Sequence, residues 1–98
     1  MSYDSKFKSE ETELFFDAIL TLKDKEDCYR FFEDISTISE LKAIAQRIHI
    51  AKLLAEDSTY VDIKSETGAS TATISRVAKC LNYGADGYKI VLSRMKIK

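Results

Sequence analysis

The side chains best suited to chemistry lie in one segment, residues 59–81, where hydroxyl and basic groups alternate with apolar residues. Short hydroxyl and alanine side chains let a helix enter the major groove of DNA, where a threonine or alanine methyl can meet a thymine methyl. Arginine and lysine in the same segment can contact guanine or phosphate. The chemistry that these residues indicate is polar contact with nucleic acid.

The predicted contacts come from the outward face of this segment. Its second helix, about residues 71–81, is expected to turn Ile74, Val77, Ala78 and Leu81 inward, which leaves its polar positions outside. A glycine turn between amphipathic helices also occurs in bundles that bind nothing, but the basic outer face favours DNA binding. The candidate DNA-binding residues are Lys64, Ser70, Thr71, Ala72, Thr73, Ser75, Arg76 and Lys79.

A helix-turn-helix over about residues 59–81 would position these side chains. Such a motif needs two short helices joined by a turn of about three or four residues. Gly68 can adopt the positive φ that a sharp helix end requires, and Ala69 is small enough to lie inside the turn. Ser70 is expected to cap the second helix, and Ile63 is expected to pack against Ile74 and Val77.

Other reactive side chains do not form a catalytic or metal-binding pattern. His49 lies within a predicted helix without an evident nucleophile or acid partner, so the sequence predicts no enzyme. Cys28 and Cys80 are far apart and, with a single histidine, predict no zinc site. They are interpreted as small, partly buried apolar residues in a reducing compartment.

The net charge of −1 conceals a strong division along the chain. Residues 1–58 hold 8 Lys/Arg and 13 Asp/Glu, a net charge of −5, whereas residues 59–98 hold 7 and 3, a net charge of +4. An anionic partner is therefore expected on the C-terminal half. No apolar run approaches the ~20 residues of a membrane span, and no signal peptide is evident, so we expect a cytoplasmic protein without membrane contact.

The rest of the chain predicts an all-α fold of about six helices in a single domain, residues 1–98. Proline is absent and glycine occurs three times, which disfavours a fold built on tight β-turns. Helix starts are expected at Ser9 and Asp24, and Thr37 opens a capping-box pattern with Glu40. The helix of about residues 40–55 is expected to be central and buried on more than one side.

The two ends of the chain carry further expectations. Aromatic residues are concentrated in residues 15–32, more than two short helices can bury alone, which indicates a shared dimer core. Near the other end, Gly84 is expected to cap the second helix of the motif, with Asn82 and Tyr83 in the turn and Tyr83 and Tyr88 as core or hinge residues. Asp86 would start a last helix whose inward residues are Ile90, Val91 and Met95.

The motif resembles that of a known family. Residues 63–76, Ile-Lys-Ser-Glu-Thr-Gly-Ala-Ser-Thr-Ala-Thr-Ile-Ser-Arg, are similar to the helix-turn-helix of the tryptophan repressor superfamily, and residues 46–54 are similar to its preceding helix. The ending at residues 80–88 resembles the smaller YerC/YecD-type branch. The resemblance covers roughly residues 10–95. It implies an intertwined homodimer on double-stranded DNA, with recognition helices about one DNA turn, roughly 34 Å, apart.

The resemblance also implies a candidate effector pocket at Thr37, Arg47, Arg76, Val77 and Cys80. Two arginines that clamp the ligand in the family correspond to Arg47 and Arg76. Val77 replaces a glycine beside the ligand and takes part of its space, and Cys80 replaces a serine with a poorer hydrogen-bonding group. A different small molecule, or none, therefore fits better than tryptophan. Alternatively, Arg47 forms a salt bridge and Arg76 contacts phosphate.

The residues and the resemblance together predict a sequence-specific, homodimeric transcriptional regulator, a repressor, that needs no cofactor. The alternative is a helical, dimeric protein-interaction module without specific DNA binding. Salt separates the two hypotheses, because DNA affinity falls steeply as salt rises.

Overall fold

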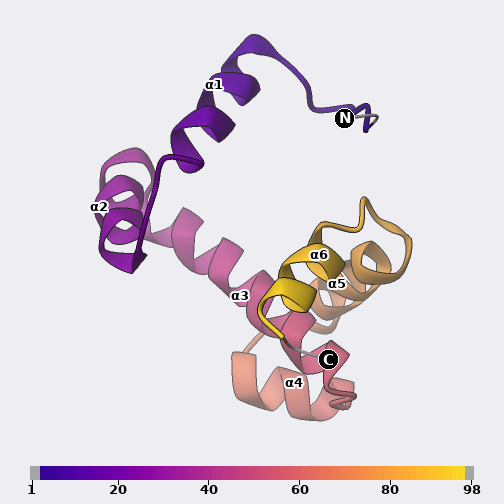
Figure 1. Cartoon of the computed structure of the whole chain (residues 1–98). Helices are drawn as coiled ribbons and strands as arrows, with labels where there is room; N and C mark the ends of the chain where they lie inside the picture. The colour runs from indigo at the N-terminus through magenta and orange to yellow at the C-terminus, as the bar shows by residue number, and fades with distance from the viewer. Residues whose placement is uncertain (1–2, 97–98) are drawn as a thin grey trace. The chain divides into compact units, whose positions relative to one another are not determined.

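The computed structural model describes residues 3–96, and these residues form six α-helices and no strand (Figure 1). The predicted all-α class and the number of helices are confirmed. The chain divides between Thr37 and Ile38 into two compact units, which we call the N-terminal unit and the C-terminal unit.

The N-terminal unit contains α1 (Glu10–Ile19) and α2 (Lys25–Ile35). Both begin where the sequence predicts. The Ser9 hydroxyl accepts a hydrogen bond from the Thr12 amide at 3.0 Å, and an Asp24 carboxylate oxygen accepts one from the Asp27 amide at 2.9 Å. Each cap satisfies an amide that the first helical turn leaves without a backbone acceptor.

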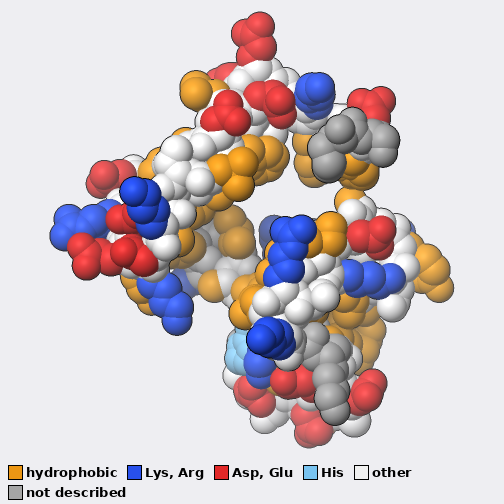
Figure 2. Space-filling model, in the orientation of Figure 1, with side chains coloured by type: hydrophobic (Ala, Val, Ile, Leu, Met, Phe, Trp, Pro, Cys, Tyr) orange, Lys and Arg blue, Asp and Glu red, His pale blue; other side chains and the backbone are white. Residues whose placement is uncertain are grey.

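Aromatic rings connect these two helices without forming an enclosed core. Phe15 of α1 stacks on Phe31 of α2 with ring centroids 6.2 Å apart, and Phe31 meets Phe32 edge-on at 5.5 Å. No residue of either helix is buried, and the Leu14 side chain is 70% exposed. Figure 2 shows hydrophobic side chains gathered on the surface of this unit. Two short helices therefore leave most of their apolar face uncovered within the chain.

The C-terminal unit contains α3 (Ile38–Ala55), α4 (Tyr60–Thr67), α5 (Thr71–Tyr83) and α6 (Gly87–Arg94). The long α3 packs against the other three helices, and α5 also packs against α4 and α6. Side chains from all four helices and the turn after α4 form one apolar core. Its buried members are Ile50, Ala51, Leu53, Ile63, Ala69, Ile74, Val77 and Leu92.

The predicted burial of the central helix is only half correct. The buried residues of α3 all lie between Ile50 and Leu53, in its C-terminal half. Ile38 and Ile44, in the N-terminal half, are 65% and 54% exposed. The prediction was wrong for this half because it assumed that one chain supplies neighbours along the whole length of the helix.

The end of the chain differs from expectation in three ways. Helix α5 continues through Asn82 and Tyr83, so these residues are helical and Tyr83 is 85% exposed. Gly84 does follow as the C-cap, but its φ is −89°. Glycine is needed there because an added Cβ would lie 2.3 Å from the Cys80 carbonyl oxygen. Cys28 and Cys80 are both exposed rather than partly buried.

The inward face of α6 was also predicted in the wrong register. Asp86 does precede the helix, but Ile90, Val91 and Met95 are 46%, 45% and 57% exposed. Leu92 is buried and Tyr88 packs against the core. These two side chains lie one helical turn apart, so α6 contacts the core along a single narrow stripe.

Candidate nucleic-acid interface

The turn between α4 and α5 has the geometry that the sequence predicts. Gly68 has φ +74° and ψ +5°, and its amide donates a hydrogen bond to the Lys64 carbonyl oxygen at 2.9 Å. An added Cβ at Gly68 would meet no atom within 4 Å. The backbone conformation rather than space therefore requires glycine here. The Thr67 hydroxyl fastens the turn by donating to the Ile63 carbonyl at 2.7 Å and accepting from the Ala69 amide at 3.1 Å.

The two helices are held together by the predicted apolar contacts. Ile63 and Ile74 are fully buried and Val77 is 2% exposed, and all three belong to the same core. Ala69, which is 3% exposed, fills the inside of the turn. Because these side chains are stiff and closely packed, they fix the angle at which α5 leaves the turn.

The predicted outward face of α5 is open to solvent. The Ser70 hydroxyl accepts a hydrogen bond from the Thr73 amide at 3.2 Å, which confirms it as the cap. Thr73 is half-buried beside this cap. The other predicted contact residues are all exposed, and they are Lys64, Ser70, Thr71, Ala72, Ser75, Arg76 and Lys79.

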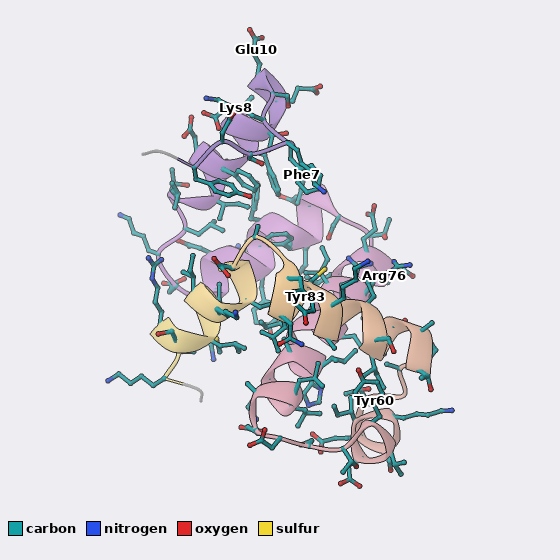
Figure 3. All side chains as sticks on the ribbon, turned by 90° about the vertical axis from the view of Figure 1, so that its right-hand side faces the viewer. Phe7, Lys8, Glu10, Tyr60, Arg76 and Tyr83 are labelled. Atoms are coloured by element: carbon teal, nitrogen blue, oxygen red, sulfur yellow. The ribbon has the colours of Figure 1, made fainter. Side chains whose placement is uncertain are left out.

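The basic groups on this face have no acidic partner within the chain. Among residues 3–96, no carboxylate forms an ion pair with Lys64, Arg76 or Lys79. Arg76 extends from α5 into solvent (Figure 3). Unpaired guanidinium and ammonium groups beside short hydroxyl side chains can bind phosphate oxygens and the acceptors of base edges.

Two polar contacts from α3 to α4 were not predicted. The Gln46 amide nitrogen donates to the Thr67 carbonyl oxygen at 3.2 Å, and His49 Nε2 lies 3.0 Å from Glu66 Oε2. They attach the last turn of α4, just before Gly68, to the central helix. Gln46 and His49 are three residues apart and so share one helix face, which the sequence could have shown, but their partners depend on the packing of α4.

The candidate effector residues fall into different environments. Arg47, Arg76 and Cys80 are exposed, whereas Val77 is buried in the core. Thr37 ends the N-terminal unit. No carboxylate of residues 3–96 forms an ion pair with Arg47, so the salt bridge considered for it is not found in that part of the chain.

A residue that the sequence did not indicate, Tyr88, lies close to two members of this set. Burial raises the pKa of Tyr88, the nearby Cys80 thiol raises it further, and the Arg47 guanidinium lowers it. The phenol of α6 thus lies near a side chain of α3 and a side chain of α5.

Other kinds of site were searched for in the described part of the chain. Residues 3–96 contain no group of three or more His, Cys, Asp or Glu side chains that could hold a metal ion. Within the same residues, none of the helices has the length and apolar character to cross a bilayer.

Comparison with known proteins identifies relatives across nearly the whole chain. Residues 10–96 match the sequence profile of the Trp repressor protein family. The uncharacterized protein YerC of Bacillus subtilis (strain 168) is 54% identical over 91 residues, which cover 93% of this chain and 88% of that protein.

Two solved structures have the same fold. A TrpR-like protein from Eubacterium eligens ATCC 27750 aligns with a TM-score of 0.91 and 51% identity, covering 96% of this chain and 97% of the other. A candidate Trp repressor from Staphylococcus aureus aligns with a TM-score of 0.90 and 45% identity, covering 95% and 93%. The chain therefore belongs to the Trp repressor protein family.

Proposed function

We propose that this protein is a homodimeric, sequence-specific DNA-binding regulator that represses transcription. The observation that supports this most strongly is the exposed, unpaired polar face of α5, which directly follows a rigid glycine turn. Family membership supports the same conclusion at the level of a helix-turn-helix regulator. We propose no catalytic activity, and we place the protein in the cytoplasm, where a regulator of this kind meets DNA.

In the proposed complex, the N-terminal half of α5 enters the major groove. Thr71, Ala72 and Ser75 are short enough to let the helix approach the base edges closely. Arg76 and Lys79, which follow on the exposed face, would contact guanine or phosphate. Since most of these side chains are short, water-mediated contacts and DNA shape would supply part of the specificity.

The homodimer is supported by the apolar surface that the chain leaves uncovered. The N-terminal unit has no buried residue in its helices, and side chains such as Leu14 and Phe16 are 70% and 51% exposed. A second copy of the chain would cover them and would present two copies of α5. Two-fold symmetry then requires a palindromic operator with half-sites about one DNA turn apart.

Selection of bound duplexes from a random DNA pool tests this function directly. We expect a palindrome to be recovered at low and at physiological salt, with affinity that falls as salt rises. Binding without any enriched motif, lost at physiological salt, would contradict sequence-specific recognition. The absence of binding to any duplex would favour a protein-interaction module.

Arg76→Ala tests the role assigned to α5. Losing one contact to guanine should weaken binding to the selected duplex by about 1–3 kcal/mol and relax specificity at one position. Arg30→Ala is the matched control, because Arg30 is exposed on α2 and pairs with Glu26 of the same helix. Equal affinity of both variants would remove Arg76 from the interface.

A further inference from the structure

The family resemblance assigns a small-molecule effector to the region between α3 and α5, and the residues of this chain can be tested against that assignment. A flat aromatic ligand between these helices needs open space beside the second arginine. Here the next residue, Val77, is 2% exposed and packs in the core with Ile74. A buried valine side chain fills this space and has no free surface to offer a ligand. The position therefore does not fit an added ring.

The same region already receives a ring from the chain itself. Tyr88 lies in the first turn of α6, a helix that packs against both α3 and α5. Its side chain is half-buried against the apolar core. Its hydroxyl also lies close enough to the Arg47 guanidinium and the Cys80 thiol for both to affect its ionisation. Tyr88 thus combines an apolar ring contact with polar neighbours on both helices that would hold an effector.

We propose that Tyr88 takes the place of the effector, so that the protein adopts its DNA-binding form without any small molecule. A tethered ring is always present at its site, so α5 is held against α3 at every ligand concentration. Arg76, which is exposed, is then left free to contact DNA. This inference depends on the proposed DNA binding, but its main test does not.

The first test uses effector binding alone. Because the chain contains no tryptophan, the fluorescence of added L-tryptophan reports its binding without background. We expect no binding to the wild-type protein and no shift in its melting temperature with L-tryptophan, indole or p-cresol. Tyr88→Ala should open a cavity that p-cresol fills, and p-cresol should raise the melting temperature of this variant. Binding of L-tryptophan to the wild-type protein would overturn the proposal.

The second test uses the selected duplex. We expect wild-type affinity without any effector, and Tyr88→Ala should bind at least about tenfold more weakly, because less of the protein would be in the binding form. Addition of p-cresol should restore most of this loss. Tyr83→Ala is the control, since this tyrosine is 85% exposed on α5 and packs against nothing in the core.

Remaining outcomes are equally decisive. If the wild-type protein binds the duplex only after L-tryptophan is added, the proposed function holds and this inference fails. If no duplex is bound under any condition, the proposed function fails, and the melting temperatures still decide whether Tyr88 fills the site. If Tyr88→Ala does not fold, the ring is retained in Tyr88→Phe, which should keep wild-type affinity and still bind no L-tryptophan.

Discussion

The two units of this protein have similar numbers of apolar side chains to bury but differ in what they bury. The C-terminal unit contains all eight buried residues of the described chain, drawn from four helices and a turn. The N-terminal unit has none, although it carries Phe15, Phe16, Phe31 and Phe32. Burial of apolar area is the main force that stabilises a fold. The C-terminal unit can therefore hold its shape from its own sequence, whereas the N-terminal unit needs a surface from outside the chain.

The charges show the same contrast. Acidic residues predominate in the first 58 residues and basic residues in the last 40, with net charges of −5 and +4. An acidic surface near DNA would be repelled, so the proposed DNA contact and the proposed chain-to-chain contact are assigned to different units. One unit is suited to binding an anionic polymer, and the other to binding a second copy of itself.

Leu14→Asp should have the largest effect, because it would separate these two roles. Leu14 is exposed in the single chain, so a carboxylate costs little there, but the same carboxylate would be buried in a dimer. We expect the dimer dissociation constant to rise by about 100-fold, measured by sedimentation velocity over a range of concentrations.

Val61→Asp is the matched control for this change. Val61 is 77% exposed on α4 of the C-terminal unit, and the proposed dimer surface does not include it. This variant should remain as dimeric as the wild-type protein. Equal dimerisation of the Leu14 and Val61 variants would show that the exposed face of α1 is not the dimer surface.

Gly68→Val should have a smaller effect, limited to the C-terminal unit. A β-branched residue at φ +74° is strained, and we expect the free energy of unfolding to fall by about 2 kcal/mol in urea titrations. Gly87→Ala should be neutral or slightly stabilising, since an added Cβ meets no atom within 4 Å and φ is not in the left-handed region. Equal stability of the two variants would contradict the turn geometry.

The sequence predicted local features well because their causes are local. The caps at Ser9, Asp24 and Ser70 depend on residues three positions apart, and the turn at Gly68 depends on one backbone angle. The helix-turn-helix could be predicted for the same reason. Its core contacts follow from apolar spacing, which places Ile74 and Val77 on one face.

Features that depend on distant residues could not be predicted in this way. The register of α6 was wrong because the spacing of apolar residues permits several faces, and the packing of Tyr88 and Leu92 selects one. The exposed half of α3 was missed because periodicity shows which face is apolar but not which chain covers it. The proximity of Tyr88 to Arg47 and Cys80 joins three helices, and no spacing in the sequence encodes it.

The smallest predicted effect concerns pH and compares two tyrosines of the C-terminal unit. Burial raises the pKa of Tyr88 above 10.0 in the folded protein, so the folded state holds this proton more tightly than the unfolded state. The free energy of unfolding should therefore fall as the pH rises from about 10 through the raised pKa.

Tyr88→Phe removes this titrating group and keeps the ring, so it should flatten part of the decrease above pH 10, measured by urea titration at each pH. Tyr83→Phe is the control, because its side chain is 85% exposed and should meet similar solvent in both states. If the two variants have the same pH profile, the Tyr88 hydroxyl is not held against the core. Because the measurement needs neither DNA nor a ligand, it tests the packing of α6 on α3 and α5 separately from any function assigned to it.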